Sequence, residues 1–334
     1  MKKLVLLALL FIISSCGTEE PKTMQLAAGS GTAGFQDGNP ADLSKPIRLA
    51  PYTDNSIVFA DINNHAIRIA SIDGTVKTIV GGPGKDGYQD GPATDAKLNS
   101  PHGVAYDKSS NKIYVAEAGS HVIRVISKNE NGEFEVSTLA GIPGNAGFRD
   151  GPADSAKFIS PHAVIVCKDG GLAVADIGNA RIRKIKEGIV STIAGSGESG
   201  TNDGTPEEAS FKYVMDIVSD GNHIYMADAG SHTIRKITPG KKVTTLSLKD
   251  TLSTPHGIAV DSDGNIYIAD MGTHRILKVY QDGMVESIAG TGKEGQGLLE
   301  LNKPAAVLVH ANYLWIADLN NHQIKVLELS NKGE

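Results

Sequence analysis

Three histidines follow a proline at the start of predicted strands, in the dipeptides Pro101-His102, Pro161-His162 and Pro255-His256. A neutral imidazole is a common metal ligand, and it also serves as an acid or base near neutral pH. If these strands line a common axis, the three imidazoles converge there from different segments of the chain. Three imidazoles with one open coordination position are the ligand set of a catalytic zinc site. His102, His162 and His256 are therefore candidate zinc ligands.

The equivalent position in three other segments holds Ile47, Tyr213 and Ala305, when the segments are aligned on a hairpin turn or on a downstream Ala-Asp pair. Tyr213 is the one candidate for an acid–base or ligand-contacting role, and no other catalytic residue is predicted. The alternative is structural, because proline fixes the direction of the chain and a following glycine allows close backbone approach. These positions differ between segments, so they are where function is to be sought.

A second set of ionisable residues recurs regularly, at the end of an apolar strand in each segment. In most copies a histidine follows four residues later, as His65 does in the first. A feature present in every repeat is more typical of a scaffold than of a site. We expect the acids to cap the next turn and the histidines to pack or hydrogen-bond between repeats. The alternative is a ligand-binding rim around a channel mouth, formed by Asp61, Glu117, Asp176, Asp228, Asp270 and Asp318.

The acids belong to a motif that occurs six times, with an apolar strand, Ala-Asp or Ala-Glu, a short turn, and usually His-x-Ile-Arg. Successive acids are 56, 59, 52, 42 and 48 residues apart, which indicates variable loops on a constant strand frame. Each copy contains four strand-like pieces joined by turns such as Asp282-Gly283. Four antiparallel strands repeated radially form the blade of a β-propeller. The sequence therefore predicts an all-β, six-bladed propeller over residues 23–330.

The predicted fourth strand of a blade carries sequences such as Thr192-Ile193-Ala194-Gly195, and the sixth blade lacks one. A similar sequence lies near the N-terminus, at residues 25–29. We predict that this N-terminal strand completes the last blade and closes the ring, which removes an open sheet edge. Another recurrent sequence, Phe148-Arg149-Asp150-Gly151 and its equivalents at 35–38, 88–91 and 201–204, predicts a structural turn on the rim of the channel.

The motif Ala-Asp-x-x-x-His-x-Ile-Arg, followed by Thr-Ile-Ala-Gly, resembles the NHL repeat family over nearly the whole mature chain. The resemblance implies a propeller but no single function, because relatives include RNA-binding and adhesion propellers and a zinc-dependent lyase that amidates peptides. That lyase holds zinc through histidines in Pro-His contexts. By this resemblance His102, His162 and His256 would be zinc ligands, with Tyr213 near them. A calcium-dependent, lactonase-like hydrolase is the least favoured alternative.

The N-terminus predicts export and lipid attachment. Lys2 and Lys3 precede an apolar run at 4–13 that is too short for a stable membrane anchor. Ile13-Ser14-Ser15-Cys16 resembles the bacterial lipobox, which predicts a signal peptide at 1–15, a lipid on Cys16 and a tether at 16–22. An ordinary secretory signal is the alternative. Gly17, in place of the aspartate that favours inner-membrane retention, slightly favours the outer membrane of the cell envelope. Residues 331–334 form a short tail.

The net charge is −6 for the whole chain and −8 once Lys2 and Lys3 are removed, with 30 basic against 38 acidic residues. Without a basic patch, nucleic acid is not an expected partner. Cys167 lies in an apolar strand and, with Cys16 lipidated, has no disulfide partner, so we expect a buried structural thiol. The leading hypothesis is a binding module rather than an enzyme. It would hold a peptide, glycan or partner protein at the channel mouth.

Overall fold

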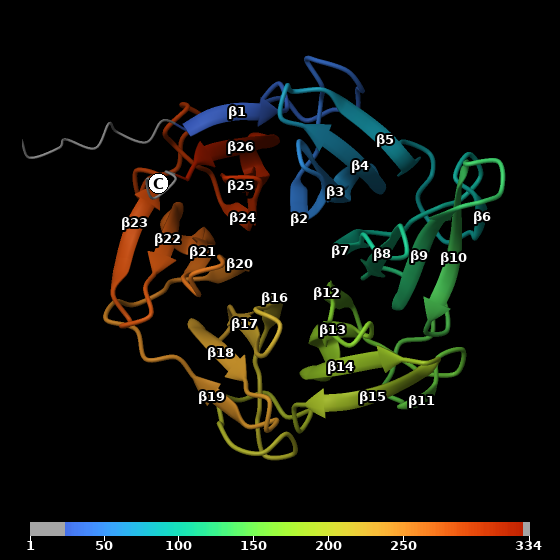
Figure 1. Cartoon of the computed structure of the whole chain (residues 1–334). Coiled ribbons are helices and arrows are strands. Elements are labelled where there is room, and N and C mark those ends of the chain that lie inside the picture. Colours follow the sequence, from blue (N-terminus) through green and yellow to red (C-terminus); the bar gives the residue numbers. More distant parts are fainter. Residues whose placement is uncertain (1–23, 330–334) are drawn as a thin grey trace, which may run out of the picture.

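The computed structural model describes residues 24–329, so the predicted signal peptide, Cys16, the tether and the tail at 331–334 lie outside the described residues. Six antiparallel sheets stand around a central axis, with β2, β7, β12, β16, β20 and β24 innermost (Figure 1). This confirms the predicted six-bladed propeller. Within residues 24–329, no helix is long and apolar enough to cross a membrane.

The first three blades follow one another from the innermost strand outward. Blade 1 contains β2 (Pro46–Thr53), β3 (Ser56–Asp61), β4 (Ala66–Ser71) and β5 (Val76–Gly81). Blade 2 contains β7 (Pro101–Asp107), β8 (Lys112–Glu117), β9 (Val122–Lys128), β10 (Phe134–Ala140) and the short β6 (Gly91–Pro92). Blade 3 contains β12 (Pro161–Val166), β13 (Leu172–Asp176), β14 (Arg181–Lys186), β15 (Ile189–Ala194) and the short β11 (Gly151–Pro152).

The other three blades repeat this order, and the last takes its outer strand from the other end of the chain. Blade 4 contains β16 (Val214–Ser219), β17 (Ile224–Asp228), β18 (Thr233–Ile237) and β19 (Val243–Thr245). Blade 5 contains β20 (Pro255–Val260), β21 (Ile266–Asp270), β22 (Arg275–Val279) and β23 (Val285–Ala289). Blade 6 contains β24 (Pro304–His310), β25 (Tyr313–Asp318), β26 (Gln323–Glu328) and β1 (Met24–Ala28).

The N-terminal strand closes the ring as predicted. β1 pairs antiparallel with β26, with Met24 opposite Leu327 and Ala28 opposite Ile324. In Figure 1 the blue β1 lies beside the red β26. Six apolar clusters then fill the spaces between neighbouring blades. Trp315 of blade 6 and Phe59 of blade 1, for example, belong to one cluster.

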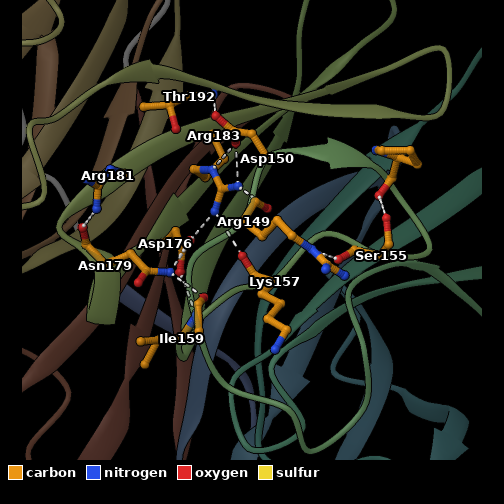
Figure 2. A network of polar contacts seen from close by, with 12 residues as sticks. Arg149, Asp150, Ser155, Lys157, Ile159, Asp176, Asn179, Arg181, Arg183 and Thr192 are labelled. Atoms are coloured by element: carbon orange, nitrogen blue, oxygen red, sulfur yellow. Dashed lines mark hydrogen bonds and ion pairs between the residues drawn. The ribbon is translucent and has the colours of Figure 1, made fainter.

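Most blades contain a buried ion pair between the repeated acid and a basic residue. Figure 2 shows the pair of blade 3 together with its hydrogen-bond partners. Arg183 lies 2.6 Å from Asp176, and both side chains are completely buried. Burial raises the pKa of Asp176, while hydrogen bonds from Asn179 and Ile159 and the charge of Arg183 oppose the shift. Equivalent pairs are Arg68–Asp61, Arg124–Glu117, Arg235–Asp228 and Lys325–Asp318.

In the four blades with a 3₁₀ turn after the acid, the repeated acid does not cap that turn, so the prediction is wrong there. The 3₁₀ turns η1 (Ile62–Asn64), η2 (Ile177–Asn179), η3 (Met271–Thr273) and η4 (Leu319–Asn321) have no side-chain cap hydrogen bond from the preceding acid. The carboxylates instead accept backbone N–H groups from the segment that leads into the innermost strand of the same blade. Asp61 accepts from Ser44 at 2.7 Å, and Asp176 accepts from Ile159 at 2.8 Å.

The repeated histidines form hydrogen bonds between blades, which confirms the structural interpretation. His65 Nδ1 accepts the backbone N–H of Ser100 in the next blade at 3.1 Å, and His121 accepts that of Ser160 at 3.0 Å. His322 accepts that of Lys45 at 3.2 Å, so the series continues across the ring closure. His274 accepts from Lys303, and His232 contacts the carbonyl of Ser253.

The recurrent Asp-Gly turns are structural, but their predicted place on the channel rim is wrong. Asp150 binds Arg183 and accepts the backbone N–H of Thr192 in β15, the outer main strand of blade 3. The adjoining strand β11 pairs with β15. The turn therefore lies at the outer edge of the blade, where its half-exposed carboxylate covers the outer side of the buried arginine.

The buried pair in blade 3 gives a stability prediction. Arg183→Met should lower the free energy of unfolding by about 3–5 kcal/mol, because it leaves Asp176 buried without its cation. Lys186→Met is the matched control, since Lys186 forms an exposed pair 3.4 Å from Asp169 and such pairs contribute about 0–1 kcal/mol. Chemical denaturation measures both variants. Equal destabilisation by the two substitutions would contradict the buried-pair account.

Candidate functional site in the axial channel

The observed strand register corrects one of the six residues predicted to open the inner strands, namely the one in blade 4. In five blades the residue after a strand-opening proline is Ile47, His102, His162, His256 or Ala305. In blade 4 Val214 pairs with Asp228, as Pro46 pairs with Asp61, so Met215 is the equivalent residue. Tyr213 precedes β16 and is 60% exposed. The predicted alignment of Tyr213 is therefore wrong, because no proline marks the start of this strand.

The three predicted histidines lie close together at the start of the inner strands. The ring centroids of His102 and His162 are 3.9 Å apart, with an angle of 43° between the planes. His162 Nδ1 is 2.8 Å from the carbonyl oxygen of Ser160, and His256 Nδ1 is 2.8 Å from that of Ala305. A carbonyl accepts, so both Nδ1 atoms donate and both Nε2 atoms are left with a lone pair.

Burial lowers the pKa of all three histidines and so favours their neutral form. Burial lowers the pKa of His256 to about 3, with a further contribution from the charge of Arg48. Burial also lowers the pKa of His162, and that of His102 lies well below its usual value. His162, Arg48 and His256 each lower the pKa of His102 further. Neutral imidazoles suit metal binding, but within residues 24–329 no group of three or more His, Cys, Asp or Glu side chains is placed to hold a metal ion.

The next position along the inner strands carries a feature that sequence reasoning missed. It holds Arg48 in blade 1, Asp216 in blade 4, and small residues in the other four blades: Gly103, Ala163, Gly257 and Ala306. Blades 1 and 4 face each other across a six-membered ring. Arg48 Nε lies 3.3 Å from Asp216 Oδ1, and both side chains are at least nine-tenths buried. An ion pair therefore crosses the axis.

This axial ion pair connects four blades. Arg48 Nη1 donates to the carbonyl of Ala305 in blade 6 at 3.2 Å, and Nη2 donates to that of Met215 in blade 4. Asp216 accepts the backbone N–H of Ile258 in blade 5 at 3.0 Å. Burial raises the pKa of Asp216, and the positive charge of Arg48 opposes that shift. A charged residue within each of two apolar strands was the available sequence signal.

Small residues allow the inner strands to approach around this pair. A Cβ atom on Gly257 would lie 2.5 Å from the Cα of Ala306, and one on Gly103 would lie 2.7 Å from the carbonyl oxygen of His162. Neither position can hold a larger side chain without a backbone shift. The glycines after the Pro-His dipeptides therefore serve close approach, as the structural alternative predicted.

An apolar cavity of about 280 Å³ begins at the axial ion pair. Among the described residues that line it, only Arg48 and Asp216 are charged, and all six inner strands contribute to its wall. The wall extends toward the far ends of these strands, to Tyr106, Ser219 and Leu308. None of the three histidines lines it. The cavity thus lies at the opposite end of the inner strands from the predicted mouth.

The remaining predicted groups take no part in this cavity. All six repeated acids, from Asp61 to Asp318, are completely buried and do not form an accessible rim. Cys167 is partly buried just beyond β12. Burial raises the pKa of its thiol, and neighbouring Lys184 opposes the shift.

Comparisons with known proteins agree with the repeat and the fold. A sequence model of the NHL repeat matches residues 98–126 and 252–279. NHL repeat-containing protein 2 from Bos taurus is 29% identical over 338 residues, which cover 84% of this chain and 46% of that protein. The chain therefore spans less than half the length of this relative.

Two solved structures share the architecture at low identity. An auxiliary nutrient binding protein from Bacteroides thetaiotaomicron superposes with a TM-score of 0.64 at 12% identity, covering 91% of this chain and 75% of that one. A virginiamycin B lyase from Staphylococcus aureus superposes with a TM-score of 0.55 at 15% identity, covering 87% and 84%. These likenesses concern the fold alone. With six blades, a closing N-terminal strand and two matched repeats, the chain is a six-bladed β-propeller that contains NHL repeats.

Proposed function

We propose that this protein is an extracytoplasmic binding module that holds a small ligand in the axial cavity. The observation that carries the proposal is the cavity of about 280 Å³, which has largely apolar walls from all six blades and an ion pair at one end. Ligand sites in proteins are typically apolar hollows with a few convergent polar groups that set orientation. The fold-level likeness to a nutrient binding protein supports a binding role by analogy.

Binding is favoured over catalysis because the cavity lining offers little for covalent chemistry. Its only charged side chains, Arg48 and Asp216, are paired with each other. Tyr106 and Ser219 lie at its far end, where Tyr106 donates to Asn111 at 2.9 Å and Ser219 donates to the carbonyl of His223 at 2.8 Å. A peptide, glycan or partner protein would engage this end of the propeller through a group that enters the cavity.

A cavity-filling substitution tests the binding proposal. Ile165→Trp enlarges a side chain of the cavity wall and should abolish binding of small aromatic and aliphatic fragments, as followed by saturation-transfer NMR. Ile189→Trp is the matched control, because Ile189 lies on outer strand β15 of the same blade and is 49% exposed. Fragment binding that survives in a folded Ile165→Trp protein would show that the cavity is not the binding site.

The proposed location rests on the N-terminal sequence. The run of apolar residues before Ile13-Ser14-Ser15-Cys16 would direct export, and a lipid on Cys16 would hold the propeller at the outer membrane of a bacterial envelope. Nucleic acid remains an unexpected partner for this acidic chain. The protein would contact the membrane through the lipid on Cys16 alone.

Cys16→Ala tests the anchor. Wild-type protein expressed in a Gram-negative host should incorporate labelled fatty acid and sediment with membranes. The variant should lose the label and move to the soluble extracytoplasmic fraction, because the thiol is the attachment point. Unlabelled wild-type protein would contradict lipidation, while export without a lipid would favour an ordinary secretory signal.

A zinc-dependent lyase or hydrolase is the second candidate function. The observation that favours it is the pair of Nδ1 contacts, which leaves the Nε2 lone pairs of His162 and His256 available as metal ligands. His102 packs against His162 and would be the third ligand. Without a three-ligand arrangement among residues 24–329, the site would need to rearrange around the ion.

Elemental analysis tests the zinc candidate. If the three histidines hold zinc, the purified wild-type protein should contain one zinc per chain, and His162→Ala should lose it while remaining folded. His223→Ala is the control, because His223 is held by Asp220 near the surface of blade 4. Wild-type protein that takes up no zinc from a supplemented buffer would rule this candidate out.

A further inference from the structure

The polar end of the axial cavity has hydrogen-bonding capacity on both of its residues. An arginine has five N–H donors and a carboxylate accepts at about four lone-pair sites. Arg48 Nε faces Asp216 and is buried, while Nη1 and Nη2 each use one N–H to donate to the carbonyls of Ala305 and Met215, so each has a second N–H. Asp216 accepts two backbone N–H groups, from Ile217 and Ile258. Donors on Arg48 and acceptors on Asp216 are therefore available next to each other.

The charges around the cavity disfavour a ligand that carries a net charge. Arg48 and Asp216 neutralise each other, and no other lining residue is charged. A ligand with a single charge would bring an unbalanced ion into apolar surroundings, which is strongly unfavourable. A neutral head group avoids that cost.

The cavity volume limits the size of the ligand, or of the part of a ligand, that lies inside it. Liquid water occupies about 30 Å³ per molecule, so about 280 Å³ corresponds to roughly nine waters. A compact ligand with about that many non-hydrogen atoms fits without displacing the wall. The wall residues Ala50, Ala105, Val164, Ile258 and Val307 are apolar, so the body of the ligand should be apolar too.

We infer that the axial cavity binds a small, uncharged ligand with an apolar body and a carboxamide-like head group. The head carbonyl accepts from Arg48, and its N–H donates to Asp216. A carboxamide is neutral and carries an acceptor next to a donor, which matches the capacity of the axial pair. The inference rests on the proposed function, because it specifies the ligand class of the same cavity.

Four single-ring ligands that differ in their head group test the inference on the purified full chain. Benzamide, benzoate, benzylamine and toluene share the apolar body and differ in head charge and hydrogen bonding. At pH 7, calorimetry or saturation-transfer NMR should show benzamide binding at least tenfold more tightly than the other three. Sites built to hydrogen-bond a ligand discriminate strongly against analogues that lack the group. Tighter binding of benzoate or benzylamine, or equal binding of toluene, would overturn the ligand class and leave the cavity as the binding site.

Absence of binding by all four probes would instead overturn the proposed function itself, and the inference with it. A charge variant adds an independent measurement. Asp216→Asn leaves Arg48 as an unbalanced cation, so the preference should shift at least tenfold from benzamide toward benzoate. Circular dichroism and the melting temperature show whether the variant is folded. An unchanged preference in folded Asp216→Asn protein would show that the axial pair does not set selectivity.

Discussion

Closure of the ring is the constraint on which the rest of the structure depends. The pairing of β1 with β26 joins the first described strand to the last, and it brings blade 6 against blade 1. The apolar cluster that contains Trp315 and Phe59 exists only when these blades meet. Closure also sets the radius at which the six inner strands converge. The axial ion pair and the cavity are therefore properties of the complete ring and of no single blade.

The repeated and the irregular positions of the motif have different roles. Repeated positions form the buried ion pairs and the contacts between blades. Blade 5 shows that the ion pair itself is replaceable, because Leu277 stands where Arg235 stands in blade 4. There Asp270 accepts backbone N–H groups from Ser253 and Thr254. The carboxylate thus has a constant task, which is to hold the segment leading into the inner strand, while its charge partner varies.

The fold could be predicted from the sequence because its determinants are local and repeated six times. The Ala-Asp motif, the strand-ending sequences and the N-terminal copy together specified blade number and closure. The candidate site was less accessible. Without a proline before Val214, the register of β16 was misjudged by two residues, and Tyr213 replaced Met215 in the predicted ring. The contact between Arg48 and Asp216 depends on two residues being diametrically opposed, which becomes visible only once the blades are counted and aligned in register.

The ion pair between Arg48 and Asp216 also affects how a ligand could enter and leave the cavity. The cavity ends at this pair, and the residues behind it, His102 and His256, are only 8% and 5% exposed. The buried ion pair therefore forms one end of the cavity, and the lining extends from it toward the far ends of the inner strands. A ligand that enters from that end would pass Tyr106, Ser219 and Leu308. A large partner that covers this end of the propeller would then hold a bound ligand inside the cavity.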